Sequence, residues 1–167
     1  KNLHSWNLSY SQAKDLQNRL AGKIQFIPLK KPPQLIAGLD CAFGKNDRTI
    51  IAAAVVLKLP DFEIIEIKTA VRKVSFPYIP GLLSFREAPA CIAAVEKLKT
   101  QPDVFIIDGQ GIAHPRRLGL AAHLGRRSSK PHQLEPELQL IPGHHRAAEP
   151  RPVDRREVHQ LVRRVRH

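Results

Sequence analysis

The sequence predicts a mixed α/β domain, in which a three-strand antiparallel meander and one crossover parallel strand form a sheet with flanking helices. The chain has 167 residues, which is the size of one domain. Between positions 35 and 76, three segments rich in apolar and β-branched residues follow one another through short polar turns, as in a meander. A helix-length segment then leads to a fourth short apolar run, as a crossover connection requires.

The first helix and the three strands follow from local signals. Ser9 or Ser11 can cap a helix that runs to about Leu20, and Ala21-Gly22 ends it. Prolines at 32–33 break the chain before the first strand, because proline has no backbone donor. The expected strands are Leu35–Phe43, Thr49–Leu59 and Glu63–Phe76, with turns at 44–48 and 60–61.

A stiff loop, Pro77–Gly81, precedes the second helix, which we expect to reach about Leu98. Phe85 and Ile92 are spaced for one face of that helix. We expect Pro89 in its first turn, because an interior proline loses a hydrogen bond and clashes with the preceding turn. The remaining expected elements are a short strand over 104–107 and a helix over 116–124.

Composition excludes several classes of protein. With 43% hydrophobic and 25% charged residues, the chain is neither collagen-like, nor a coiled coil, nor wholly disordered. No apolar run approaches the ~20 residues of a membrane-spanning helix, and the N-terminus has no apolar core of a signal peptide. Cys41 and Cys91 are too few for a disulfide framework or a four-ligand zinc site. We therefore expect a cytoplasmic protein without a membrane partner.

The net charge of +12 predicts a polyanionic partner, nucleic acid first. The composition changes along the chain, since residues 1–125 hold every aromatic side chain and carry more Lys than Arg. Residues 126–167 hold five of the eight histidines and have Arg in place of Lys at nearly every basic position. We therefore expect a folded domain over 1–125 and a basic tail rich in Pro, His and Arg over 126–167, either frame-shifted or disordered.

Three carboxylates need an explanation. Asp40 lies in an otherwise apolar strand, where an unpaired charge is costly. Asp108 ends the apolar crossover strand, and strand ends are where ligands collect in open α/β sheets. A turn-forming or capping role is the alternative for each aspartate. Glu87 is the third candidate, and its alternative is a capping box with Ser84, which Pro89 disfavours.

If these three side chains meet, their charges repel, and a divalent cation removes the conflict. Ligands that are all oxygen suit Mg²⁺ or Mn²⁺, which commonly bind carboxylates together with phosphate oxygens. On a basic protein, such a site predicts metal-assisted cleavage of phosphodiester bonds. The order of elements permits the meeting, with Asp40 and Asp108 on strands and Glu87 on the crossover helix.

Four segments closely resemble the endonuclease V family: GLDCAF (38–43), PYIPG (77–81), LSFRE (83–87) and DGQGIAHPRRLG (108–119). The resemblance covers about residues 8–125 and implies a ribonuclease H-like fold. It implies a DNA-repair endonuclease that cleaves a phosphodiester bond 3′ to deoxyinosine, although some members of the family cleave RNA. It also implies that Asp40, Glu87 and Asp108 are the catalytic, metal-binding residues, with Mg²⁺ as the cofactor and Mn²⁺ as its alternative. We expect a monomer whose partner is DNA containing deoxyinosine.

The resemblance assigns contacts with the lesion to two loops. Pro77, Tyr78, Ile79 and Pro80 would form a wedge in the duplex, where the tyrosine ring can stack in place of a displaced base. The alternative is a rigid loop with a packed tyrosine. Backbone groups of Gly81–Leu83 and Gly109–Gly111 would bind the flipped hypoxanthine, since a missing Cβ lets the backbone approach a base. The further candidates are His114, whose alternative is a structural hydrogen bond, and the phosphate contacts Arg116 and Arg117, whose alternative is a solvated helix start.

The resemblance ends near Gly125. The family continues with an apolar strand that carries a lysine beside the active site, and the sequence after Gly125 has no counterpart of it. A later family segment of PGHR type supplies a histidine, and PGHHR at 142–146 leaves His144 and His145 as candidates for it. We expect a domain whose last third is missing or replaced through a shifted reading frame. The rival hypothesis is a genuine basic extension that binds phosphates.

Two other functions stay open. A missing strand would remove one wall of the site, which favours a catalytically inactive nucleic-acid-binding fragment. A carboxylate cluster without inosine selectivity would instead indicate another ribonuclease H-like metal-dependent nuclease.

Overall fold

The elements of the structure follow the predicted order. The structure is a computed structural model and describes residues 4–44 and 47–125, so the expected tail, with His144 and His145, lies outside the described residues. None of the described helices combines the length and the apolar composition that crossing a membrane requires. The elements are α1 (Tyr10–Ala21), β1 (Leu35–Phe43), β2 (Thr49–Lys58), β3 (Glu63–Lys73), α2 (Leu83–Val95), β4 (Val104–Ile107) and α3 (Leu120–Gly125).

The four strands form one mixed sheet in the order β3-β2-β1-β4. The first three pair antiparallel through short turns, as the meander predicts. β4 then pairs in parallel with β1, from Ile36 opposite Val104 to Leu39 opposite Ile107. A parallel pair needs a crossover, and α2 supplies it. The predicted α/β fold with a meander and a crossover strand is therefore confirmed.

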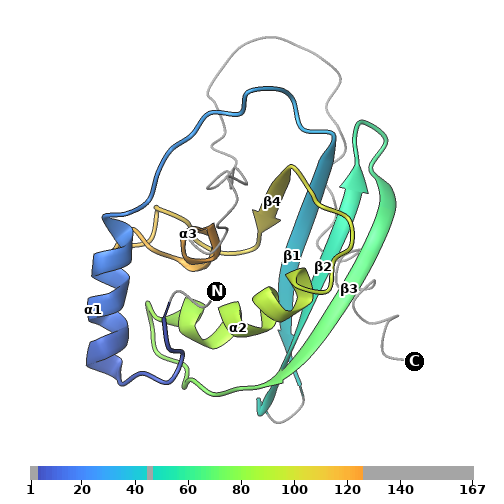
Figure 1. The fold of residues 1–167 in the computed structure, drawn as a ribbon. Coiled ribbons are helices and arrows are strands. Elements are labelled where there is room, and N and C mark those ends of the chain that lie inside the picture. The colour runs from blue at the N-terminus through green and yellow to red at the C-terminus, as the bar shows by residue number, and fades with distance from the viewer. Residues whose placement is uncertain (1–3, 45–46, 126–167) are drawn as a thin grey trace.

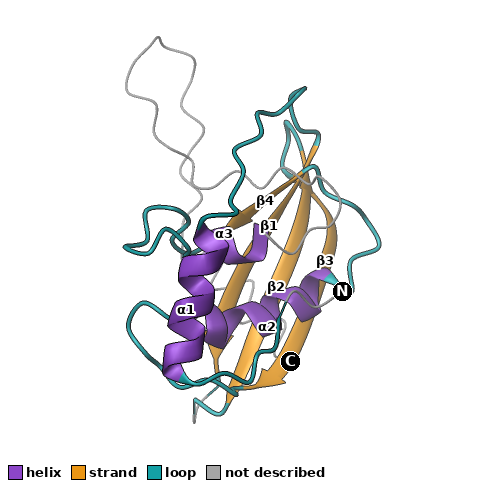
Figure 2. Ribbon diagram, turned by 60° about the vertical axis from the view of Figure 1, so that its left-hand side comes forward, coloured by secondary structure: helices purple, strands orange, loops and turns teal. Residues whose placement is uncertain are grey.

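The helices cover one face of the sheet (Figure 1, Figure 2). On that face β2 presents Ile50, Ala52, Ala54 and Val56, all buried, which alternate with half-buried residues that point to the other side. The alanines let α2 lie close to the sheet. The pairing places Val71 and Ile106 on the opposite face, where they are 64% and 53% exposed, so that among the described residues this face has no apolar cover comparable to α2.

A second apolar cluster joins α1 to the start of α2 and to the segment before α3. Leu82, Phe85 and Leu118 are completely buried there, together with Ala13 of α1. Ser9 begins α1 as predicted, because its hydroxyl accepts from the amide of Gln12 in a reciprocal capping box. This cluster holds α1 against the two loops that flank α2 and α3.

The position of Pro89 was predicted wrongly. Helix α2 begins at Leu83, so Pro89 lies in its second turn. Burial of Leu82 and Phe85 fixes the start of the helix upstream, and this apolar packing outweighs the hydrogen bond that the proline removes. Other boundaries also moved: β2 ends at Lys58, β3 at Lys73 and α2 at Val95, and α3 begins at Leu120 rather than Arg116.

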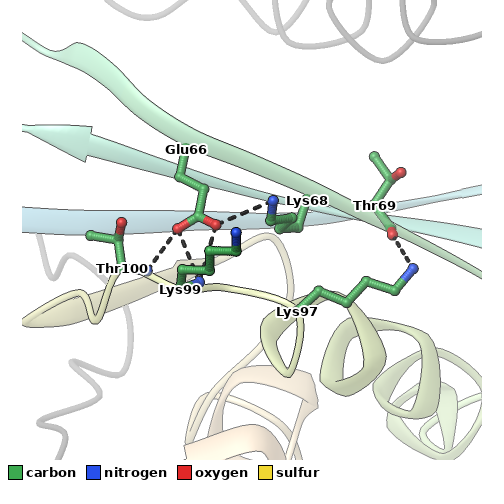
Figure 3. Close-up of polar contacts among 6 residues, drawn as sticks. All are labelled: Glu66, Lys68, Thr69, Lys97, Lys99 and Thr100. Atoms are coloured by element: carbon green, nitrogen blue, oxygen red, sulfur yellow. Dashed lines mark hydrogen bonds and ion pairs between the residues drawn. The ribbon is translucent and has the colours of Figure 1, made fainter.

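Glu66 connects β3, at the edge of the sheet, to the loop between α2 and β4 (Figure 3). Its carboxylate accepts from the amides of Lys99 and Thr100 at 2.7–3.1 Å and lies 3.4 Å from the Lys68 ammonium. These backbone donors lower the pKa of Glu66 to about 2. Beside it, Lys97 donates to the Thr69 carbonyl at 2.8 Å. The loop that leads into β4 is thus fixed by charge-assisted hydrogen bonds.

Glu66→Gln should lower the midpoint of thermal unfolding by a few degrees at pH 7, because a neutral amide accepts hydrogen bonds more weakly than a carboxylate. The folded-state pKa lies below the ordinary value of 4.5. The contribution of Glu66 is therefore present above pH 4.5 and is lost as the pH falls toward 2. Circular dichroism melts should show the two proteins converging over that range. Glu63→Gln, at an exposed position of the same strand, is the control, and an equal loss in both variants would contradict the prediction.

Candidate active site

Asp40 and Asp108 are neighbours at one point of the sheet. β1 and β4 pair in parallel up to Leu39 and Ile107, and the amide of Asp108 donates to the Leu39 carbonyl at 3.2 Å. The next residue of each strand is therefore an aspartate. Asp40 is half-buried and Asp108 is exposed. The structure thus brings together two of the three carboxylates that the sequence singles out.

Glu87 reaches the same region from α2. One turn later on that helix, the Cys91 thiol lies 3.2 Å from the Cys41 thiol, which follows Asp40 in β1. The hydrogen bond with Cys91, followed by burial, raises the pKa of the Cys41 thiol well above its ordinary value. The Cys41 thiol therefore stays uncharged, and the two sulfurs hold α2 against β1 beside Asp40 and Glu87.

Burial raises the pKa of Glu87 to about 7, and the charges of Asp40 and Asp108 act in the same direction, while Arg86 opposes them. The three carboxylates therefore lie close enough for their charges to interact. The alternative role of Glu87 in a capping box is wrong, because Leu82 caps α2 without a side-chain hydrogen bond. The Ser84 hydroxyl instead contacts the buried ring of His123 at 3.0 Å.

The side chains of the three carboxylates do not converge on one point as the ligands of a metal ion would. Asp40 accepts a hydrogen bond from the amide of Cys41 at 2.7 Å. Within the described ranges, no group of three or more Asp, Glu, His or Cys side chains is placed to hold a metal ion. The chemistry of the donors nevertheless fits a hard dication, because all are oxygens and their mutual repulsion already raises the pKa of Glu87. The metal site stays a prediction.

The loop Pro77–Gly81 presents its tyrosine to solvent. Tyr78 is 69% exposed, so the alternative of a packed tyrosine is wrong. Pro77 and Pro80 are exposed as well, whereas Ile79 packs partly against the α1–α2 cluster and anchors the loop. Gly81 ends the loop with φ of +79°, a conformation that favours glycine. Leu83 follows as the partly exposed first residue of α2.

The segment from Asp108 to Gly119 is a closed loop. The amide of Gly119 donates to the Gly111 carbonyl at 2.9 Å, and the amide of Ala121 donates to the Gln110 carbonyl at 3.2 Å. A side chain at Gly119 would collide with that Gln110 carbonyl, which explains the glycine. Gly109 also has a positive φ, +154°. The loop therefore holds Gly109 and Gly111 next to the end of β4.

His114 is buried in this loop. Its Nδ1 accepts from the amide of Arg116 at 3.0 Å, which supports its alternative role as a structural hydrogen-bonder. Burial lowers the pKa of His114, and the nearby charge of Arg116 lowers it further. The other ring nitrogen is buried, and among the described residues it has no hydrogen-bond partner. Its role toward nucleic acid stays a prediction.

The two arginines of the loop differ. The Arg116 guanidinium faces inward, where it donates to the Gln17 side-chain oxygen at 2.5 Å and to the Gly81 carbonyl at 2.7 Å. Arg117 is exposed, with φ of +55°. Their alternative role as a solvated helix start is wrong, because α3 begins only at Leu120. Their contact with phosphate stays a prediction.

Sequence reasoning missed Gln17, which is 1% exposed in the middle of α1. A signal was present, because positions 13, 16, 17 and 20 share one helix face and position 17 is polar. His123 was missed as well. Its Nε2 atom lies 2.8 Å from Nε2 of His4. Burial lowers the pKa of His123 to about 3.

Comparison with known proteins identifies the family. The endonuclease V family model matches residues 18–132. The chain belongs to the endonuclease V family. It is 47% identical over 126 residues to endonuclease V of Trichormus variabilis, a match that covers 73% of this chain and 56% of the relative. It is 43% identical over 131 residues to that of Dehalococcoides mccartyi strain BAV1, covering 78% of this chain and 59% of the relative.

Solved structures of endonuclease V share the fold. The crystal structure from Streptomyces avermitilis superimposes with a TM-score of 0.68 at 41% identity, covering 72% of this chain and 54% of that one. Endonuclease V of Ciona intestinalis, in complex with a 24mer DNA containing an inosine followed by a ribo-adenosine, gives 0.63 at 30% identity, covering 69% and 52%. The predicted ribonuclease H-like fold is thereby confirmed. The chain spans about half the length of the curated relatives it matches.

Glu87→Gln should remove a pH dependence of stability in the metal-free protein. The pKa of Glu87 in the folded protein, about 7, exceeds its ordinary value of 4.5. The contribution of the protonated Glu87 side chain to folding stability is therefore fully present below pH 4.5 and is lost as the pH rises through 7. Because Glu87 is only half-buried and partly screened, the loss should be about 1–2 kcal/mol. Urea unfolding in EDTA at pH 5 and pH 8.5 measures it. The free energy of unfolding of the wild type should be lower at pH 8.5 than at pH 5, while that of the variant should not change. An equal change in both proteins would contradict the prediction.

Proposed function

We propose that this chain is an endonuclease that cleaves DNA at a phosphodiester bond 3′ to deoxyinosine with the help of a divalent metal. The observation that carries the proposal is the parallel register that makes Asp40 and Asp108 neighbours. Glu87 lies close enough that, in addition to burial, the charges of both aspartates raise its pKa. Asp40, Glu87 and Asp108 would hold Mg²⁺, with Mn²⁺ as the alternative. The bound ion would act as a Lewis acid that activates water and stabilises charge on the leaving oxygen.

The exposed Tyr78 supports a role of the Pro77–Gly81 loop in DNA. Two prolines stiffen the loop, Ile79 anchors it, and the tyrosine ring is left free to stack on a base. The Ciona relative was solved with inosine-containing DNA, which supports the same substrate class here. The loop would then enter the duplex as a wedge.

Backbone groups near Gly81 and Gly109 would bind the flipped base. Two polar groups of the first stretch are already engaged inside the protein: the amide of Leu82 donates to the Ile79 carbonyl at 2.9 Å, and the Gly81 carbonyl accepts from Gln17 and Arg116. Recognition would therefore use the remaining backbone groups of the two stretches. His114 and Arg117 would contact the nucleic acid around them.

A second function is favoured by two observations. The chain spans about half of its relatives, and the apolar face opposite α2 carries exposed Val71 and Ile106. A nuclease domain over 1–125 that needs further chain to complete its site would bind nucleic acid without cleaving it. Under this proposal residues 126–167 form a separate basic segment, and the cytoplasmic monomer that we expect would be an inactive binder.

Nicking of matched duplexes with and without one deoxyinosine should separate these functions. We expect Mg²⁺-dependent nicking of the deoxyinosine strand only, abolished by EDTA. Asp108→Asn should slow it by about a thousandfold, because the charge stabilisation supplied by a bound metal is worth several kcal/mol, and each 1.36 kcal/mol is tenfold in rate.

Asp61→Asn, in an exposed turn, is the control and should nick at the wild-type rate. Binding to the deoxyinosine duplex without nicking would establish the inactive binder. Nicking that survives Asp108→Asn would show that the metal site is assigned to the wrong residues.

A further inference from the structure

Gln17 connects three segments that are distant in the chain. Its side-chain amide donates to the Gly81 carbonyl at 3.0 Å and to the Leu118 carbonyl at 2.7 Å, while its oxygen accepts from Nε of Arg116 at 2.5 Å. Both donors and the acceptor of a side chain that is 1% exposed are thus satisfied. An amide placed so deeply in an apolar cluster is costly unless all its hydrogen bonds are made, so its position is tightly determined.

Arg116 completes the same network. Its Nη2 donates to the Gly81 carbonyl at 2.7 Å, so that this carbonyl accepts from both Gln17 and Arg116. A Cβ atom at Gly81 would lie 2.6 Å from Nη2. The glycine is therefore required by the approach of the guanidinium as well as by its positive φ. The guanidinium donates to two acceptors from two separate nitrogens in a fixed planar geometry, whereas the donors of a lysine ammonium all lie on one nitrogen.

The network lies between the two stretches proposed to bind the flipped base. Gly81 begins one of them, and Leu118 lies next to Gly119, whose amide closes the loop onto Gly111 in the other. We infer that Gln17 and Arg116 are positioning residues that hold these two loops in register for inosine recognition. This inference rests on the proposed function.

The inference assigns different roles to adjacent arginines. Arg116 acts through the Gly81 carbonyl, so its loss should affect the discrimination between inosine and normal duplexes. Arg117 is exposed, so its loss should weaken both duplexes alike and reduce the salt dependence of binding. Discrimination and uniform affinity are therefore separate readouts of the two positions.

Equilibrium binding of the full 167-residue chain tests the role of Gln17. Fluorescence anisotropy is measured with matched duplexes, with and without one deoxyinosine. The readout is the Kd of the normal duplex divided by the Kd of the deoxyinosine duplex. For Gln17→Leu this ratio should fall about tenfold, because three hydrogen bonds that fix the loops are lost. Asn18→Leu, at an exposed neighbouring position of α1, should keep the wild-type ratio. A purely structural loss would reduce the fraction of active protein and leave the ratio unchanged.

A pair of lysine variants keeps the test decisive if Gln17→Leu does not fold. Arg116→Lys preserves the positive charge but not the planar fork, and it should lower the ratio about as much as Gln17→Leu. Arg72→Lys, at an exposed position of β3, should preserve both the ratio and the salt dependence. If Arg116 were only a phosphate contact, the lysine at position 116 would also preserve the ratio.

The outcomes separate the inference from the function on which it rests. If wild type binds both duplexes equally, the proposed function is refuted for this chain, and the inference falls with it. If wild type prefers deoxyinosine and folded Arg116→Lys or Gln17→Leu keeps that preference in full, the function stands and the inference is overturned. A reduced ratio with Asn18→Leu and Arg72→Lys unaffected supports it.

Discussion

When β4 pairs in parallel with β1, the Leu39 carbonyl accepts a hydrogen bond from the amide of Asp108, and the two aspartates that come directly after the paired residues become neighbours. Side-by-side carboxylates are unfavourable in a protein without a counter-ion. Burial raises the pKa of Glu87, and the charges of both aspartates raise it further. The site is therefore a place where the backbone pairing opposes electrostatics, and the remaining contacts of the fold keep that pairing intact.

Uncharged side chains hold α2 in place near the three carboxylates. The thiols of Cys41 and Cys91 meet between β1 and α2, and a raised pKa keeps the Cys41 thiol uncharged, so the helix is held without a further charge. At the start of α2, the uncharged His123 ring contacts Ser84. The loops that precede α2 and α3 are fixed by Gln17 and Arg116.

The strands could be predicted because their apolar alternation and polar turns are local signals. The order of elements permitted Asp40 and Asp108 to meet but did not fix the register that makes them neighbours. Glu87 could be proposed but not placed, since nothing local fixes the rotation of α2 on the sheet. Pro89 was misplaced because the packing of Leu82 and Phe85 overrides a propensity. The inward turn of Arg116 was unpredictable, because its partner Gln17 lies on a helix about a hundred residues earlier, where a polar side chain normally faces water.

The parallel pairing also sets the order in which the site can form. The meander of β1, β2 and β3 needs only local contacts, whereas Asp108 reaches Asp40 only after a long stretch of chain has closed into a loop. Non-local pairing of this kind is slow. On a ribosome, where the N-terminal part emerges first, a stable three-strand sheet would wait without a completed carboxylate centre until the end of β4 arrives. A chain that stops before the end of β4 would therefore lack the pairing that brings Asp108 to Asp40.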